Sequence, residues 1–410
     1  MIKGKKMRAK VSFMLLVCIA LSMNSIVYAT PENPMQSQTL PSAVTVPDDF
    51  STLQEALNNA EHSATVYLKE GVYSVTSPIT IAQNVSIIGI GKPTVEFSGD
   101  GKILVKTDES IEVKKDAPNV TLEGIKFIGK YGESEFKELE NLEAAYGKGR
   151  EKEFDSIKEL SEFSDKMSVL YEEADKKSNV MTEKYPLITI LEGSLSIKGC
   201  TVSCDSGSSL LIVGKGAFLT AIDSFFEKNG FDAVAVTESE VSFDSCTFAQ
   251  NRRSSVVLKQ DAKAVLTNCT INDSLIGIKA LKDSQLIIEK TLASGCPTAI
   301  SCSCDSTLRL VEGKLINSNL DSIYIKGYSK AIVIRTVFLD APVHITTEDH
   351  SQTEVYDSTF SNGNVGAVTA KRKATVQFDD NCKFHNIKYK LLDEATVVTT
   401  HDKSLFNLMY

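Results

Sequence analysis

The sequence predicts an all-β protein, a right-handed parallel β-helix in which coils of about 22–24 residues stack along one axis. Two observations predict this solenoid. An apolar position recurs at nearly constant spacing between residues 202 and 384, and short aliphatic segments such as residues 285–288 and 331–334 alternate with turns rich in Asn, Asp, Ser and Gly. A period of about 22 residues has room for two or three short strands with their turns, but none for a helix.

The recurring apolar position defines the coils, and its side chains should lie over one another at the strand spacing of roughly 4.8 Å. It is occupied by Val202, Phe226, Phe248, Ile271, Leu292, Leu315, Phe338, Phe360 and Phe384, at spacings of 21 to 24 residues. Two positions earlier the residues should also point inward, and they are Cys200, Ser224, Cys246, Cys269, Lys290, Gly313, Thr336, Ser358 and Cys382. Most of these are small, and Lys290 is the exception. Three positions earlier the residues should point outward, because side chains alternate along a strand.

The first 29 residues have the pattern of a signal peptide. Five basic residues at positions 3, 5, 6, 8 and 10 precede an apolar run over residues 11–21, which is too short for a membrane anchor, and Val27, Tyr28 and Ala29 supply a cleavage site. Residues 30–44 are rich in Pro, Ser, Thr and Gln and should form a linker. We therefore expect a secreted or periplasmic protein with no membrane span in its mature chain.

The β-helix should begin and end with caps. Residues 45–130 are expected to hold an N-terminal cap and the first coils, with a short helix whose N-cap is Ser51 and whose capping box is completed by Gln54. That helix would cover the open end of the first coil. The coils should resume over residues 186–385, and residues 386–410 should form a C-terminal cap.

A charged insertion interrupts the coils over residues 131–185. Between residues 133 and 177 it holds 14 acidic and 8 basic residues, and apolar residues from Phe154 to Ala174 recur at gaps of three and four, which predicts a helical hairpin. Two roles stay open for this hairpin: a decoration packed on the solenoid, or an arm for a partner or for self-association.

The charge of the chain excludes one class of partner. The formal net charge of −9 falls to −14 when the five basic residues of the signal peptide are removed. Nucleic acid is therefore not expected, because phosphate binding needs clustered Lys and Arg. A polyanionic glycan would need a bridging cation such as calcium, and the sequence indicates no other cofactor.

Four residues three positions before the apolar ladder form the best catalytic candidate. Glu289, Glu312, Arg335 and Asp357 should lie in one outward column on adjacent coils. Carboxylates on neighbouring coils can raise one another's pKa and act as an acid–base pair, or they can hold calcium. The alternative is a surface charge ladder of little energetic value.

Two further sets of side chains could bind metal or form a bridge. His344 and His350, near a coil corner with Glu348 and Asp349, join Glu289 and Glu312 as weak metal-ligand candidates. Cys246 and Cys269 should stack on adjacent coils, at a separation that permits a disulfide but also suits two free inward thiols. Arg252 and Arg253 are expected in a solvated loop.

Three segments near the start of the β-helix resemble known proteins. Residues 46–57 (VPDDFSTLQEAL), 66–73 (VYLKEGVY) and 84–91 (NVSIIGIG) are similar to the opening of pectinesterase-like and other pectin-lyase-fold proteins. The resemblance implies a right-handed parallel β-helix, and the later coils are similar to the general repeat of that superfamily.

The resemblance does not extend to the catalytic motifs of those enzymes. Val75 stands where pectinesterases have Glu, and neither their Gln-Asp-Thr-Leu nor their Asp-Phe-Ile-Phe-Gly segment is present. The polygalacturonase motifs have no counterpart either. We therefore expect a solenoid that binds an extended polysaccharide or a cell-surface protein. The alternatives are a polysaccharide lyase or glycoside hydrolase on the pectin-lyase fold, and a structural cell-envelope protein.

Overall fold

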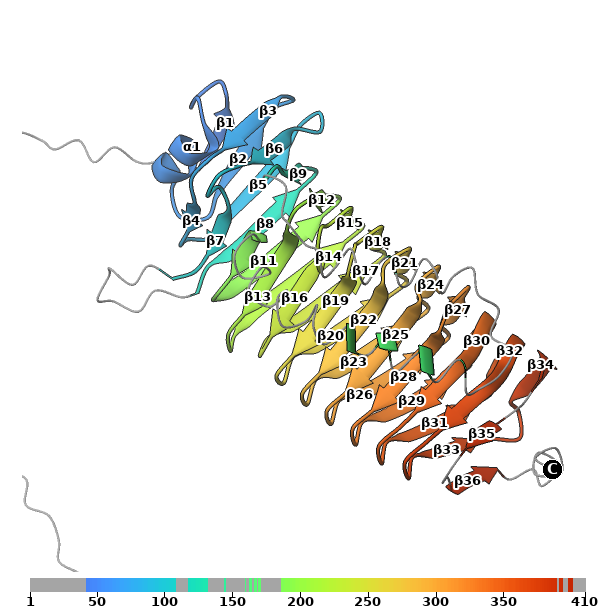
Figure 1. The fold of residues 1–410 in the computed structure, drawn as a ribbon. Helices are drawn as coiled ribbons and strands as arrows, with labels where there is room; N and C mark the ends of the chain where they lie inside the picture. Colours follow the sequence, from blue (N-terminus) through green and yellow to red (C-terminus); the bar gives the residue numbers. More distant parts are fainter. Residues whose placement is uncertain are drawn as a thin grey trace, which may run out of the picture. The chain divides into compact units, whose positions relative to one another are not determined.

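A computed structural model describes residues 42–107, 117–131 and 186–388, the backbone of 391–393 and 397–400, and eight separate residues between 144 and 170. The predicted signal peptide, most of the linker and most of the insertion lie outside the described residues. The described chain is a right-handed parallel β-helix, as predicted, in which each strand pairs in parallel with the equivalent strand of a neighbouring coil (Figure 1).

Each coil contributes strands to three faces. Face 1 is a 14-stranded sheet made of β1 (Ala43–Val46), β2 (Ala64–Leu68), β5 (Val85–Gly89), β8 (Asn119–Glu123), β11 (Gly193–Lys198), β14 (Ala217–Ile222), β17 (Glu240–Asp244), β20 (Lys263–Thr267), β23 (Gln285–Glu289), β26 (Thr307–Val311), β29 (Lys330–Ile334), β31 (Gln352–Tyr356), β33 (Thr375–Phe378) and β36 (Val397–Thr400).

Face 2 holds the shortest strands. It consists of β3 (Val72–Val75), β6 (Thr94–Phe97), β9 (Lys126–Gly129), β12 (Thr201–Cys204), β15 (Phe225–Glu227), β18 (Thr247–Ala249), β21 (Thr270–Asn272), β24 (Leu292–Ser294), β27 (Lys314–Ile316), the first halves of β30 (Val337–Thr347) and β32 (Thr359–Ala370), and β34 (Lys383–Ile387).

Face 3 follows face 2 in each coil. It consists of β4 (Ile79–Ile81), β7 (Ile103–Val105), β10 (Pro186–Ile190), β13 (Ser208–Val213), β16 (Val234–Thr237), β19 (Ser254–Lys259), β22 (Ile276–Leu281), β25 (Thr298–Ser303), β28 (Asp321–Lys326), the second halves of β30 and β32, and β35 (Leu391–Asp393). Strands β35 and β36 pair with β32 and β33, so the stacking continues into the segment predicted to be a cap.

The apolar ladder is confirmed at every coil but one. Its members pair in register from Val202 to Phe384, and their rings stack, as for Phe338 and Phe360 with centroids 4.6 Å apart and planes 2° apart. The prediction was wrong at Leu292, because Ile271 pairs with Ala293. This shift of one residue places Thr291 among the small inward side chains, where Lys290 did not fit.

A left-handed residue turns the chain from face 1 to face 2 in successive coils. The position three before the ladder has φ near +50° at Asp223, Ser245, Asn268, Lys290, Glu312, Arg335 and Asp357. Asp and Asn tolerate this conformation better than most residues do. The outward column that was predicted to include Glu289 is therefore a row of turn residues. We call it the turn row, and Lys290 occupies the position in it that was predicted for Glu289.

One described helix, α1 (Leu53–Asn59), covers the first coil as predicted, with Leu53, Ala56 and Leu57 buried. Its N-cap is Thr52, whose side chain accepts a hydrogen bond from the Glu55 backbone N–H. The prediction of Ser51 was wrong by one residue, because Thr52 is three positions before Glu55. Ser51 instead donates its backbone N–H and its hydroxyl to the Glu55 carboxylate. Among the described residues, no helix is long and apolar enough to cross a membrane.

Candidate functional site

The predicted column consists of Glu289, Glu312, Arg335 and Asp357. The strand register separates Glu289 from the other three residues. Arg335 donates to Glu312 Oε1 from Nη2 at 2.8 Å and from Nε at 3.2 Å, on adjacent turns. Glu289, at the end of β23 on face 1, instead receives a hydrogen bond from Arg309 at 3.2 Å.

Both ion pairs of this column lie in solvent. The Arg335 and Glu312 side chains are 52% and 38% exposed, and those of Arg309 and Glu289 are 49% and 43% exposed. Pairs of this kind contribute about 0–1 kcal/mol to stability. The geometry therefore agrees with the surface charge ladder that was the alternative to a catalytic column.

The structure does not bring the four metal-ligand candidates together. His344 is fully buried, with its ring 5.8 Å from the rings of both Phe338 and Phe360. Burial lowers the pKa of His344 to about 4, against the opposing effects of the Ser361 backbone and Asp340. His350 lies exposed on a turn. In the described part of the chain, no group of three or more His, Cys, Asp or Glu side chains could hold a metal ion.

Cys246 and Cys269 lie on adjacent coils as predicted, and both are free thiols. The Cys246 thiol donates to the Asp244 carbonyl, and the Cys269 thiol donates to the Thr267 carbonyl. Burial raises the pKa of Cys246 to about 12 and that of Cys269 to about 11. Of the two arrangements left open by the sequence, the structure has the inward thiols.

The prediction of a solvated loop at residues 252–253 was wrong for Arg253. Its side chain is 2% exposed, and Nη1 donates to Asp232 Oδ2 at 3.0 Å. The other oxygen of Asp232 accepts from the Ser254 backbone N–H at 3.1 Å. This pair lies where face 2 turns into face 3. The spacing of charged residues in the sequence does not reveal that the side chains at this turn are buried.

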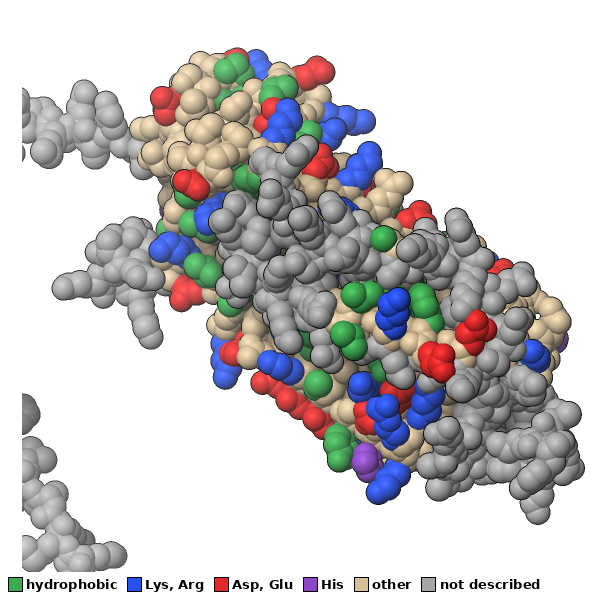
Figure 2. Space-filling view, viewed as in Figure 1, with side chains coloured by type: hydrophobic (Ala, Val, Ile, Leu, Met, Phe, Trp, Pro, Cys, Tyr) green, Lys and Arg blue, Asp and Glu red, His purple; other side chains and the backbone are tan. Residues whose placement is uncertain are grey.

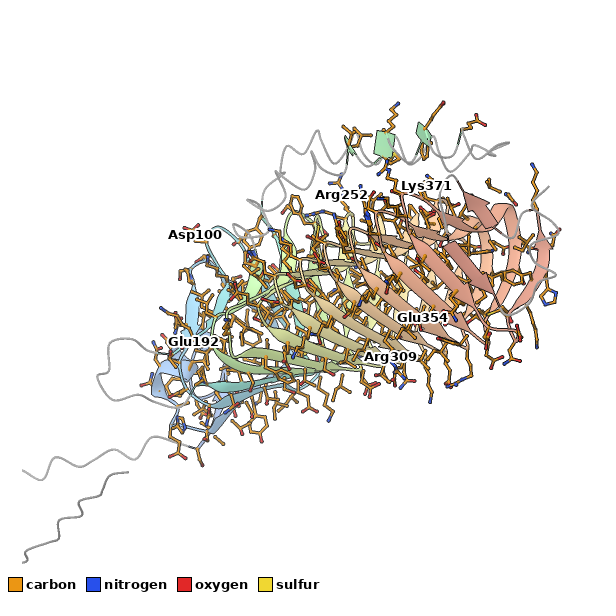
Figure 3. All side chains as sticks on the ribbon, turned by 90° about the horizontal axis from the view of Figure 1, so that it is seen from below. Asp100, Glu192, Arg252, Arg309, Glu354 and Lys371 are labelled. Carbon is orange, nitrogen blue, oxygen red and sulfur yellow. The ribbon has the colours of Figure 1, made fainter. Side chains whose placement is uncertain are left out.

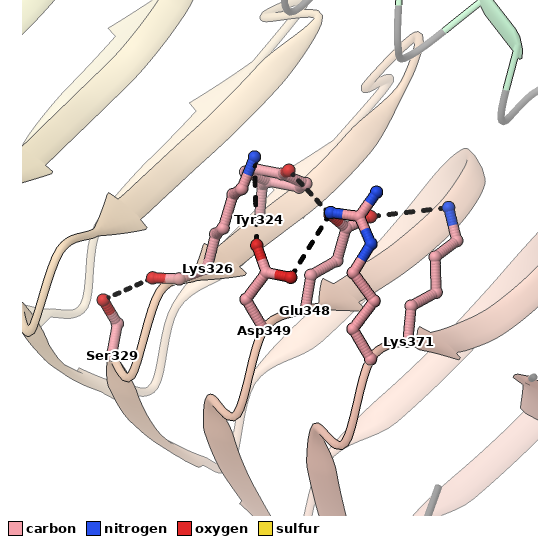
Figure 4. Close-up of polar contacts among 7 residues, drawn as sticks. Tyr324, Lys326, Ser329, Glu348, Asp349 and Lys371 are labelled. Atoms are coloured by element: carbon pink, nitrogen blue, oxygen red, sulfur yellow. Dashed lines mark hydrogen bonds and ion pairs between the residues drawn. The ribbon is translucent and has the colours of Figure 1, made fainter. Parts of the chain in front are cut away.

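A cluster of polar side chains lies where face 3 of the last coils turns into face 1 (Figure 4). We call it the corner cluster, and it consists of Tyr324, Lys326, Tyr328, Glu348, Asp349, His350, Lys371 and Arg372. The strands bring its members together because coils of 22 to 24 residues place Tyr324 beside Thr346, and Thr346 beside Thr369, in register.

Glu348 is the centre of the corner cluster. Its side chain is 9% exposed and accepts a hydrogen bond from the Tyr324 hydroxyl at 3.1 Å. Lys371 Nζ lies 3.4 Å from one carboxylate oxygen, and Arg372 Nη1 lies 3.8 Å from the other. Burial, reinforced by the charge of Glu348, raises the pKa of Tyr324. The hydroxyl of Tyr324 therefore stays a donor over the physiological range.

The rim of the corner cluster is open to solvent. Asp349 receives a hydrogen bond from Arg372 at 3.3 Å and lies 4.0 Å from Lys326 Nζ. Next to it, the rings of Tyr328 and His350 stack with centroids 5.0 Å apart and planes 10° apart. Tyr328 is 60% exposed. An aromatic platform thus adjoins charged groups that can donate and accept hydrogen bonds.

Asp321 lies on the same strand as Tyr324 and is buried. Thr346 donates a hydrogen bond to its Oδ1. Burial raises the pKa of Asp321 to about 7, and although the Thr346 hydrogen bond and Lys371 oppose this shift, the charge of Glu348 adds to it. A carboxyl group that titrates near neutral pH can give and take a proton, which makes Asp321 an acid–base candidate.

A row of acidic residues extends from the corner cluster along the same edge of the solenoid. Glu238, Asp261, Asp283 and Asp305 occupy equivalent left-handed turn positions on successive coils. They line an open hollow of about 410 Å³. Figure 2 shows a line of acidic side chains along one edge of the coils. The row adds negative charge beside the cluster and therefore disfavours a polyanionic ligand.

Sequence reasoning found only part of the corner cluster. Glu348, Asp349 and His350 form a local run, which drew attention to this corner. Tyr324, Lys371 and Arg372 lie 23 or 24 residues away along the chain. A search for chemistry-bearing residues one coil before and after that run would have found them.

Comparisons with known proteins agree with the fold. Residues 208–312 match the family model described as right handed beta helix region. No curated protein sequence matches the chain.

Solved structures with the same fold include enzymes that act on polysaccharides. The catalytic unit of a GH87 alpha-1,3-glucanase from Streptomyces thermodiastaticus has a TM-score of 0.55 and 12% identity, covering 85% of this chain and 64% of its own. A GH87 alpha-1,3-glucanase variant in complex with tetrasaccharides has a TM-score of 0.58 and 11% identity, covering 88% and 68%. A variant of the periplasmic alginate epimerase AlgG has a TM-score of 0.52 and 8% identity, covering 87% and 85%.

These likenesses concern the fold, because the identities lie between 8% and 12%. The chain spans just under two thirds of the length of the first glucanase. The parallel three-faced coils, the matched repeat region and the solved structures of the same fold lead to one conclusion: this chain has a right-handed parallel β-helix fold.

Proposed function

We propose that this protein binds an extended, mainly neutral glycan at the corner cluster. The observation that carries this proposal is the exposed Tyr328–His350 stack beside the Asp349, Arg372 and Lys326 rim. Sugar rings pack on aromatic faces, and their hydroxyl groups take both donors and acceptors of hydrogen bonds. The sequence has no Trp, so Tyr328 serves as the aromatic platform.

The charges near the corner cluster favour a neutral glycan. The acidic row and the net charge of −9 would repel a uronate chain unless calcium bridged the two. Two of the solved relatives are described as acting on an alpha-1,3-glucan and one on alginate. An alpha-1,3-glucan oligosaccharide is therefore the first ligand to test, and alginate with and without calcium is the second.

The test is calorimetric titration of these glycans into the full chain and matched variants. Tyr328→Ala should weaken binding at least tenfold, and Arg372→Met should weaken it several-fold. Phe225→Ala removes a ring that is 47% exposed on face 2, and Arg335→Met removes an exposed guanidinium from the turn row, so both should bind as the wild type does. If no glycan binds the wild-type chain, or if the two controls lose as much affinity as the cluster variants, the proposal is wrong. Absence of any binding would favour the structural cell-envelope role.

A second candidate function, a glycoside hydrolase or polysaccharide lyase, is favoured by Asp321. A carboxyl with a pKa of about 7 can protonate a departing glycosidic oxygen, while Glu348 supplies a second carboxylate nearby. In that case Asp321→Asn and Glu348→Gln would abolish release of reducing sugar or of unsaturated ends. Loss of turnover in Glu312→Gln and Asp357→Asn instead would assign the chemistry to the turn row.

A further inference from the structure

The outward side of face 1 carries an exposed apolar patch on its later coils. Ile287 of β23 and Ile332 of β29 are 37% and 39% exposed, and Val265 and Ile334 next to them are half-buried. All four side chains point away from the core, because the residues between them along each strand are the buried ones. Neighbouring apolar side chains exposed on a protein surface mark an interaction site. We call these residues the face 1 patch.

Two side chains of opposite charge lie within the face 1 patch. Along strands β17 to β33, the middle outward position holds, in coil order, Ser242, Val265, Ile287, Arg309, Ile332, Glu354 and Gln377. Arg309 lies one coil before Ile332, and Glu354 lies one coil after it. Figure 3 labels Arg309 and Glu354 on the side of the solenoid away from Arg252 and Lys371. The two charges are therefore placed symmetrically about Ile332.

A surface with this symmetry is complementary to a second copy of itself. A two-fold axis along β29 reverses the order of the coils and keeps the direction of the strands, so each middle position faces a middle position of the other copy. Ile332 then packs on its own copy at the axis. Arg309 lies opposite Glu354 of the second copy, and the symmetry makes this contact twice. The Arg309 side chain is 49% exposed and therefore accessible to a second copy.

Other two-fold arrangements of face 1 lose this complementarity. An axis along β26 places Arg309 on its own copy, and an axis along β31 does the same for Glu354. Two solenoids that run in the same direction place both residues on their own copies. Like charges that face each other disfavour an interface. An axis midway between β26 and β29, or between β29 and β31, places both residues opposite uncharged side chains. The axis along β29 is therefore the arrangement that the charges favour.

The outward position at the end of the strands agrees with the same axis. Ile334 occupies it on β29, Val311 on the coil before and Tyr356 on the coil after. The axis therefore places Ile334 on its own copy and Val311 opposite Tyr356 of the second copy. These contacts extend the apolar centre of the interface beyond Ile332.

The size and the rim of this surface indicate a weak dimer. Seven strands, from β20 to β36, are symmetric about β29. They cover roughly 30 Å by 16 Å at ordinary strand dimensions. Two copies would bury on the order of 1,000 Å², the lower limit for a specific interface. Lys330 faces its own copy at the start of the strands, and Glu289 faces Asp379 of the second copy at their end. These like-charged contacts lie on the rim and weaken the dimer.

We infer that face 1 is the dimerisation surface of this protein, with two solenoids packed antiparallel about β29 and stabilised by two Arg309–Glu354 contacts around Ile332. This surface is independent of the proposed glycan site. The corner cluster lies on face 3 and on the turns before face 1, and none of its side chains is among the outward residues of β23 to β33.

Sedimentation velocity of the full chain, at concentrations from about 1 µM to about 500 µM, tests the inference. The wild-type chain should change from monomer to dimer within this range. Arg309→Glu and Glu354→Arg each make both contacts like-charged, so either variant alone should dimerise at least about tenfold more weakly. An equimolar mixture of these two variants carries opposite charges at the facing positions and should recover the wild-type affinity. Lys330→Gln removes a like-charged contact and should strengthen the dimer.

A matched pair of substitutions locates the surface. Ile332→Asp places two carboxylates at the axis and should leave the chain monomeric. Val337→Asp, at the same 39% exposure on face 2 of the same coil, should dimerise as the wild type does. Circular dichroism shows whether each variant is folded. If Ile332→Asp unfolds, Ile332→Thr against Val337→Thr gives the same comparison.

Three results would overturn the inference. The first is a wild-type chain that stays monomeric over the whole concentration range. The second is a mixture of Arg309→Glu and Glu354→Arg that dimerises as weakly as either variant alone. The third is an equal loss of the dimer in the folded Ile332 and Val337 variants, which would place the interface elsewhere.

Discussion

The Tyr324 hydroxyl donates a hydrogen bond to Glu348 Oε2 across two adjacent coils, at 3.1 Å. It brings together a partly buried phenol and a buried carboxylate that lie 24 residues apart in the chain. Because Lys371 also lies 3.4 Å from this carboxylate, the charge of Glu348 is compensated where water is largely excluded.

Tyr324→Phe should therefore destabilise the protein. The substitution keeps the ring but leaves Glu348 with one donor fewer in a buried position, which costs about 1–3 kcal/mol. Urea unfolding followed by circular dichroism measures the change. Tyr328→Phe, on an exposed ring, should stay within about 0.5 kcal/mol of the wild type. Equal losses in the two variants would contradict the role given to the Tyr324 hydroxyl.

Asp321 should make stability fall as the pH rises toward 7. Burial raises its pKa from the ordinary 3.8 to about 7, so between these values the folded chain holds a proton that the unfolded chain has lost. The free energy of unfolding should decrease by up to about 1.4 kcal/mol per pH unit in this window and level off above it. Urea unfolding of the wild type and of Asp321→Asn, measured from about pH 4.5 to about pH 8, isolates the contribution of Asp321 to the free energy of unfolding. The same slope in both chains would rule out Asp321 as its source.

His344 should produce the opposite dependence. Burial lowers its pKa from 6.5 to about 4, so below 6.5 the unfolded chain binds a proton that the folded chain does not. The contribution of His344 to stability is complete above 6.5 and is lost as the pH falls toward 4. His344→Phe, which fills the space between Phe338 and Phe360, should flatten the acid side of the stability curve. An unchanged acid side would mean that other groups control acid unfolding.

The buried Arg253–Asp232 pair should matter far more than the exposed Arg309–Glu289 pair. Arg253→Met leaves the Asp232 carboxylate buried without its closest cation, and breaking a pair in this way costs about 3–5 kcal/mol. Arg309→Met should cost less than about 1 kcal/mol, because its partner remains in solvent. Thermal unfolding of both variants gives the comparison, and similar midpoints would show that Arg253 is not required.

Thiol labelling should distinguish the free ladder cysteines from a bridged pair. The pKa values of about 12 for Cys246 and about 11 for Cys269, together with burial, keep both thiols protonated and covered at neutral pH. Iodoacetamide should therefore modify the exposed Cys304 in the folded chain and reach Cys246 and Cys269 only after unfolding without reductant. If these two cysteines stay unlabelled after unfolding but become labelled once a reductant is added, they form a disulfide.

The sequence predicted most of the fold because the repeat period is visible in it. An apolar side chain every 22 to 24 residues can be buried only if the coils stack, so the ladder from Val202 to Phe384 specifies both the solenoid and its inward side. The error at Leu292 arose because two apolar residues, Leu292 and Ala293, are adjacent and a pattern cannot choose between them. Backbone pairing decides the choice, since it places Ala293 beside Ile271.

By itself, the sequence determined the coil length, the small inward residues, the capping helix and the acidic character of the protein. Only the tertiary structure decided which polar residues share a site. A register shift of one residue places Glu289 outside the turn row. Tyr324, Glu348 and Lys371 are neighbours only because three successive coils lie side by side. The physical reason is that burial of apolar side chains repeats along the chain and leaves a local signature. A polar site is built across coils, where the pKa values and hydrogen bonds depend on neighbours about 22 residues away.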